Sequence, residues 1–156
     1  MWLDNRVAQP MPEGMSVSVD PAPTPDATMR RNVKFAHARY LLALLLYTDP
    51  SFPIAFTYGG KAEAPDGRAD VLDGQGPDGF AIRLFLDEKT HRPMMMTYTA
   101  RSTESTQQLR MEEYQETAGI LFPHLFSRSA DGKLREQLRF EKFVVNGRLD
   151  PRNFRK

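Results

Sequence analysis

The sequence predicts an α+β domain in which one amphipathic helix covers an antiparallel sheet of about seven strands. Three Asp-Gly pairs, at Asp66, Asp78 and Asp131, each lie between short runs of alternating apolar and polar residues. Asp-Gly tolerates the positive φ angles of a tight hairpin turn. One segment, 27–47, instead carries apolar residues at helical spacing. Together these patterns predict a meander of strands over 54–146 that must bury one face against the helix.

The helix is expected to begin after Asp26 or Thr28, because either side chain can accept a bond from an orphan backbone amide. Asp49-Pro50 is expected to stop it. Its apolar stripe is predicted to consist of Val33, Ala36, Tyr40, Leu41, Leu44 and Leu45. The basic residues are expected on its other faces: Arg30, Arg31, Lys34 and Arg39.

A side-chain period of two predicts the strands that follow. Their expected ranges are 54–64, 69–75, 80–87, 93–101, 107–117, 120–128 and 134–145. The inward-facing side chains of three of them are expected to include Phe56, Tyr58, Phe80, Ile82, Leu84, Leu86, Met94, Met96 and Tyr98. The helix and the sheet together form one predicted domain, 27–156, and the proline-rich residues 1–26 are predicted to be a flexible leader.

Composition narrows the class of protein. The 156 residues are 40% hydrophobic and 26% charged, as in an ordinary globular domain. A formal charge of +1 argues against nucleic acid as a partner. The chain has no cysteine, which excludes disulfides and thiolate chemistry. It shows no signal peptide, and its longest apolar run, 40–47, is too short to span a bilayer. Two interpretations stay open: a cytoplasmic protein, or one whose export signal is missing from this chain.

The residues predict no catalytic chemistry and no cofactor. His37, His91 and His124 lack the spacing of a metal site. Glu112 and Glu113 project to opposite faces of a strand, and so cannot converge as a glycosidase pair does. Neither a phosphate-binding glycine loop followed by a helix nor a Gly-x-Ser-x-Gly turn occurs. The run 94–96 of three methionines suits either an ordinary core or a surface that adapts to lipid chains.

Four segments, taken in order along the chain, carry a resemblance to a known family. They are Ala69-Asp-Val-Leu-Asp, Arg83-Leu-Phe-Leu-Asp-Glu-Lys-Thr-His-Arg-Pro-Met, Tyr114-Gln-Glu-Thr-Ala-Gly-Ile-Leu-Phe-Pro-His, and Phe143-Val-Val-Asn with Asp150-Pro-Arg-Asn-Phe. Over residues 29–156 the sequence resembles the LolA-like lipoprotein carriers, a superfamily of periplasmic lipid and lipoprotein binders. No single segment is specific to the family; their order carries the likeness.

The resemblance implies an unclosed half-barrel, a curved antiparallel sheet whose concave side is covered by a helix. It also implies a non-catalytic role, in which acyl chains of a lipid or lipoprotein occupy an apolar hollow in the cell envelope. The residues expected to line that hollow are Phe56, Tyr58, Ile82, Leu84, Leu86, Met94, Met96 and Tyr98. Leu41, Leu44 and Leu45 are expected to form the helical lid. No metal is expected.

The sequence departs from the family in two places. Family members carry an export signal and several N-terminal strands, whereas the predicted helix lies close to Met1 here, so this chain is interpreted as an N-terminally truncated member. Asn146-Gly147 stands where the family has Asn-Pro. Fewer strands leave a sheet edge that can pair with a protein partner or a second copy. Two alternatives remain: an interaction module with a filled core, and a hydrolase built on His91 or His124.

Overall fold

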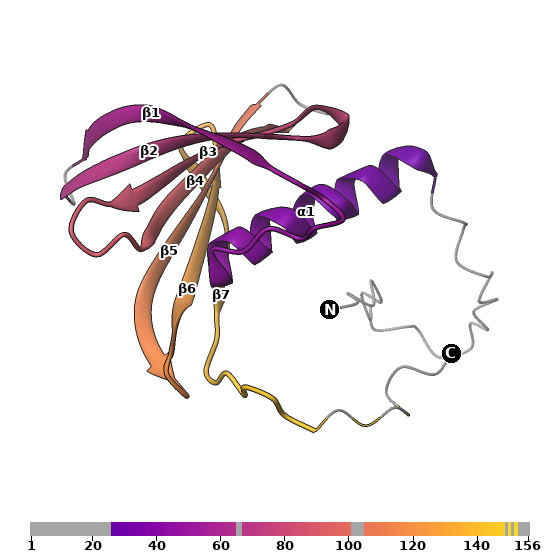
Figure 1. Ribbon diagram of the computed structural model, residues 1–156, viewed down its shortest axis with the longest axis vertical. Helices are drawn as coiled ribbons and strands as arrows, with labels where there is room; N and C mark the ends of the chain where they lie inside the picture. Colours follow the sequence, from indigo (N-terminus) through magenta and orange to yellow (C-terminus); the bar gives the residue numbers. More distant parts are fainter. Residues whose placement is uncertain (1–25, 65–66, 101–104, 149, 151, 153–156) are drawn as a thin grey trace, which may run out of the picture.

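The computed structural model describes residues 26–64, 67–100, 105–148, 150 and 152, and the predicted leader falls almost entirely outside them. One helix, α1 (Ala27–Leu45), precedes seven strands (Figure 1). The strands are β1 (Ala55–Ala64), β2 (Gly67–Gly76), β3 (Phe80–Asp87), β4 (Pro93–Ala100), β5 (Ser105–Thr117), β6 (Ile120–Ala130) and β7 (Lys133–Arg139). A short 3-10 turn, Pro77–Gly79, links β2 to β3.

The predicted fold class is confirmed. All seven strands form one antiparallel sheet in the order β1-β2-β3-β4-β5-β6-β7, so each strand pairs with its neighbour in sequence. The sheet is curved and unclosed, with β1 and β7 at its two edges, and α1 lies along its hollow side (Figure 1). The architecture is therefore a half-barrel covered by one helix.

Two of the three Asp-Gly pairs adopt the backbone conformation that their sequence favours. Asp131 and Gly132 have φ angles of 49° and 75° and connect β6 to β7 as a two-residue hairpin. Asp78 and Gly79, at 57° and 76°, make the turn before β3. The third pair is only half described, because Asp66 lies outside the described residues.

Helix α1 begins where the sequence predicts and ends two residues earlier. The Asp26 carboxylate accepts a hydrogen bond from the Met29 amide at 2.6 Å. Leu46 adopts the left-handed conformation with φ 50°, which closes the helix. The N-cap prediction is thus confirmed at Asp26.

The predicted apolar stripe of α1 was wrong in part. The buried residues are Ala38, Leu42 and Ala43, whereas Val33 and Leu45 are 61% and 48% exposed. Successive side chains of an α-helix differ in direction by about 100° around its axis, so an error of one position in the predicted stripe rotates the predicted buried face by that angle. Residues 40–47 are all apolar, so their pattern cannot select which leucines face the sheet.

The core lies between α1 and the middle of the sheet. Leu84 on β3 and Met96 on β4 are fully buried and are cross-strand partners. Leu42 of α1 and Phe126 of β6 are each 1% exposed. These side chains share one cluster with Phe80, Ile82, Leu109 and Met111. Burial of each such side chain contributes about 1.5–3 kcal/mol to the free energy of folding, so this cluster stabilises the packing of the helix on the sheet.

Aromatic contacts fix α1 at two separate places on the sheet. Phe35 meets the ring of Phe80 edge-on at 5.2 Å, and both rings pack on Phe52. Further along the helix, Tyr40 meets Phe126 edge-on at 6.2 Å. Since Phe80 begins β3 and Phe126 lies on β6, the helix spans the strands between them.

Tyr114 ties β5 to the start of β4. Its hydroxyl donates to the Pro93 carbonyl at 2.6 Å. The residue before it, Glu113, has a φ of 55°, and the pairing of β5 with β6 passes from Glu112 to Tyr114 without a change of register. Burial raises the pKa of the Tyr114 phenol well above its ordinary value.

Replacing Tyr114 with phenylalanine should lower the free energy of unfolding at pH 7 by about 1 kcal/mol, because the Pro93 carbonyl loses its donor. In the wild type the folded protein keeps a proton that the unfolded chain releases above about pH 10. Stability is therefore full below that pH and falls as the pH rises further. Urea unfolding measured from pH 8 to 11 should show that the free energy of unfolding falls less steeply with pH in Tyr114→Phe than in the wild type. An identical loss in both proteins would contradict this assignment.

Candidate functional site

Strands β3 and β4 pair along only half of their length. Their paired residues run from Leu86–Pro93 to Arg83–Thr97 and stop there. On either side the pairing continues: β2 pairs with β3 as far as Phe80, and β4 pairs with β5 as far as Ala100. The segments Phe80–Ile82 and Tyr98–Ala100 therefore diverge. This fork in the sheet is the feature on which the candidate site is built.

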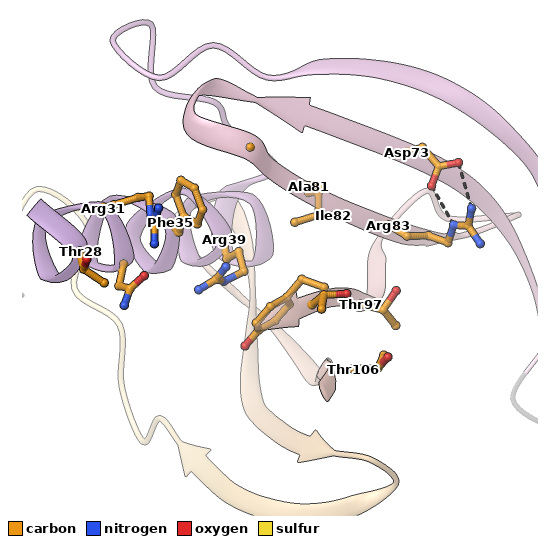
Figure 2. A pocket seen from close by; sticks show the side chains of 14 residues that line it. Thr28, Arg31, Phe35, Arg39, Asp73, Ala81, Ile82, Arg83, Thr97 and Thr106 are labelled. Atoms are coloured by element: carbon orange, nitrogen blue, oxygen red, sulfur yellow. Dashed lines mark hydrogen bonds and ion pairs between the residues drawn. The ribbon is translucent and has the colours of Figure 1, made fainter. Parts of the chain in front are cut away.

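A hollow of about 800 Å³ occupies the fork and extends to α1 (Figure 2). The helix contributes Thr28, Arg31, Asn32, Phe35 and Arg39 to its wall. The sheet and its turns contribute Asp73, Gly79, Ala81, Ile82, Arg83, Thr97, Tyr98, Thr99 and Thr106. Arg31, Phe35 and Arg39 are spaced four residues apart, so they form one stripe along the helix.

Arg39 crosses the hollow to reach β4. Its guanidinium carbon lies 4.0 Å from the centre of the Tyr98 ring, a cation–π contact. Burial lowers the pKa of Arg39 from its ordinary value, the direction expected for a cation removed from water. Among the described residues no carboxylate contacts this guanidinium.

Arg31 lies two turns earlier on the same stripe. Its Nε atom is buried and has no hydrogen-bond partner among the described residues. A buried donor without a partner costs free energy, so it is a place where a ligand or a water molecule is expected to bind. The side chain is labelled beside Phe35 in Figure 2.

The third arginine of the hollow is neutralised within the protein. Arg83 donates from Nε and Nη2 to the two carboxylate oxygens of Asp73, at 2.7 and 3.1 Å (Figure 2). The ion pair holds the pKa of Asp73 below its usual range and raises that of Arg83. This bidentate pair joins β2 to β3 at the closed end of the fork.

The residues that the sequence predicted for an apolar hollow are only partly together. Ile82 and Tyr98 line the observed hollow. Leu84 and Met96 are fully buried in the core, and Phe56 and Leu86 pack against it. Met94 is the extra residue at the register shift between β3 and β4, and is half-buried. The observed hollow therefore has a mixed polar and apolar wall.

Two predicted positions need correction. Tyr58 is 62% exposed, and its hydroxyl bonds the Asp70 carboxylate at 3.1 Å instead of facing a cavity. Leu45 is exposed on α1, while Leu41 and Leu44 are half-buried. Leu42, which the predicted lid omitted, is the leucine of α1 that is fully covered. Contact of any of these side chains with a ligand stays a prediction.

None of the histidines in the described residues lines the hollow. His124 is buried, and its Nδ1 lies 2.7 Å from the Phe140 carbonyl, so Nδ1 donates, and Nε2 has no hydrogen-bond partner in the described part of the chain. His91 is exposed in the turn between β3 and β4. Within the described ranges no group of three or more His, Cys, Asp or Glu side chains could hold a metal ion.

Comparison with known proteins gives one distant structural likeness. No protein-family model matches the sequence, and no curated protein matches it. A crystal structure from Vibrio parahaemolyticus, described as a "putative outer membrane lipoprotein-sorting protein domain", is similar with a TM-score of 0.44 and 13% sequence identity. The alignment covers 60% of this chain and 44% of that chain, so the match spans less than half of the Vibrio protein.

Neither α1 nor any other helix in the described part of the chain has the length and apolar character needed to cross a membrane.

Proposed function

We propose that this domain binds a lipid-like amphiphile without catalysing a reaction on it. The observation that carries the proposal is the hollow between α1, β3 and β4. Its volume of about 800 Å³ falls within the range of small-molecule sites. Phe35, Ile82 and Tyr98 give it an apolar wall, and arginine and threonine side chains give it a polar one. Such a mixed wall suits a ligand with an apolar chain and a polar head.

The LolA-like resemblance of the sequence supports a more specific form of this proposal. On that basis the ligand is an acyl chain of a lipid or lipoprotein, and the protein acts in lipoprotein sorting or a related task of the cell envelope. A periplasmic location then requires an export signal upstream of this chain. Each apolar methylene group transferred from water into the hollow contributes about 0.8 kcal/mol to binding.

Displacement of a fluorescent fatty acid, 11-(dansylamino)undecanoic acid, tests this proposal. The wild type should enhance the dansyl fluorescence, and lauric acid should reverse the enhancement. Ala81→Trp places a large side chain in the hollow from an exposed position on β3, and should weaken binding by about tenfold. Gln115→Trp, at an exposed position on β5 outside the hollow, is the matched control and should bind normally. Absence of fluorescence enhancement in the wild type would contradict the proposal.

A second function is favoured by a different observation. The core beneath α1 is filled, since Leu84 and Met96 are fully buried, and no strand of the described residues pairs with the outer edges of β1 and β7. A free edge can accept a strand from another chain, which is the basis of an interaction module. Under this alternative the protein binds no dansyl fatty acid but forms a dimer or a complex. Sedimentation velocity of the purified protein separates the two functions.

A further inference from the structure

The hollow carries an excess of positive charge that the protein itself does not balance. Its wall contains three arginines and one aspartate. Because Asp73 is committed to Arg83 through two hydrogen bonds, Arg31 and Arg39 are the cations left over. Neither has a carboxylate partner among the described residues. Their Cα atoms are separated by about 12 Å along the helix axis, and both side chains line the α1 side of the same hollow.

Both cations are partly withdrawn from water. Arg39 is fixed by its stacking on Tyr98, and burial opposes its charge. Arg31 keeps a buried Nε donor without a partner. An unbalanced buried charge and an unsatisfied buried donor each destabilise the unliganded protein, and an anion that contacts both arginines relieves both costs. Guanidinium groups also match carboxylate and phosphate oxygens in a two-pronged geometry.

Neutral donors line the same hollow as the two arginines. The hydroxyls of Thr97, Thr99 and Thr106 belong to the wall on the side of β4 and β5, and Thr28 and Asn32 belong to it on the side of the helix. Hydroxyl and amide groups can donate to the remaining oxygens of an anion. The apolar part, made by Phe35, Ala81 and Ile82, lies in the same wall and leaves room for a chain attached to that anion.

We infer that Arg31 and Arg39 form the binding site for the anionic group, a phosphate or a carboxylate, of the amphiphile. This inference rests on the proposed function, because it assigns the head of the ligand to the side of the proposed hollow that α1 forms. It narrows the substrate class from lipid-like molecules in general to anionic amphiphiles. The same two arginines can also bind a free anion, and the experiment below distinguishes these sources.

Isothermal titration calorimetry at low ionic strength with three probes tests the inference. Dodecyl phosphate has the chain and the anion, monolaurin has a chain of the same length without charge, and inorganic phosphate has the anion alone. The wild type should bind dodecyl phosphate about tenfold or more tightly than monolaurin. In Arg31→Gln/Arg39→Gln the affinity for dodecyl phosphate should fall to that for monolaurin, and the monolaurin affinity should not change. Arg135→Gln, which removes a charge from an exposed position on β7, should behave as the wild type.

The outcomes separate the two proposals. Equal affinity of the wild type for dodecyl phosphate and monolaurin would overturn the anion site and leave the proposed function standing. Binding of inorganic phosphate alone, lost in the double variant, would support the anion site and overturn the amphiphile. No binding of any probe would overturn both. If the double variant does not fold, Ala81→Asp adds a negative charge to the hollow from an exposed position and should weaken dodecyl phosphate binding more than Ala81→Asn does.

Discussion

Replacing Phe126 with alanine is expected to lower the free energy of unfolding by about 3–5 kcal/mol. Phe126 is 1% exposed and meets the rings of Tyr40 and Phe140 edge-on, at 6.2 and 5.5 Å. Its neighbours across β5 and β7 are Met111 and Leu138. The truncation therefore opens a cavity where α1, the sheet and the segment after β7 meet. A loss of this size is a large fraction of the stability of an ordinary domain.

Urea unfolding followed by circular dichroism measures this loss. Leu134→Ala on β7 is the matched control, because Leu134 is apolar, belongs to the same hairpin and is 57% exposed. Its effect should stay within about 0.5 kcal/mol. Similar losses in the two variants would show that Phe126 does not anchor the helix to the sheet.

Leu42→Ala is expected to cost about 2–4 kcal/mol, because Leu42 is 1% exposed and belongs to the core cluster under α1. Leu45→Ala, three residues later on the same helix, should cost less than about 0.5 kcal/mol, since Leu45 is 48% exposed. The two changes remove the same atoms from the same secondary structure, so differences in helix propensity cancel. Thermal unfolding of both variants checks the prediction. A larger loss at Leu45 would instead favour the stripe predicted from the sequence.

The sheet could be predicted from the sequence because its signals are local. Side-chain alternation and the turns at Asp78 and Asp131 fix the order of the strands and their antiparallel pairing. The largest error in a strand boundary is at the C-terminal end of β7, which is Arg139, whereas the sequence predicted a strand that continues to residue 145. Beyond it, Phe140 and Phe143 still contribute to the packing, through aromatic contacts with Phe126 and Phe122. The alternation of apolar residues in the segment after Arg139 therefore arises because these side chains pack against the sheet, although the segment is not a strand.

The helix could be located but its orientation could not. Phe35, Ala38 and Leu42 recur at spacings of three and four, which is the pattern of the face that packs. An alternative stripe through Val33, Tyr40 and Leu44 has equally good spacing. Which stripe is buried depends on where the sheet places Phe80 and Phe126, and that is a tertiary contact.

The candidate site could not be predicted from the sequence, because it exists only where strands β3 and β4 stop pairing with each other. Nothing in the alternation of β3 or β4 indicates that their register stops at Arg83 and Thr97. Arg31 and Arg39 were therefore expected on faces away from the sheet, although they line the hollow. A signal was present in retrospect: two arginines flank Phe35 at intervals of four residues, which places charge on a face that also carries an aromatic anchor.

An open sheet normally presents two rims of free backbone groups, and within the described residues these belong to β1 and β7. The divergence of Phe80–Ile82 from Tyr98–Ala100 creates a third rim in the interior of the sheet. The peptide groups that point across this gap need partners other than the opposing strand. Side chains, solvent or a bound molecule supply those hydrogen bonds, so a molecule that fills the gap can stabilise the central strands directly through their backbone.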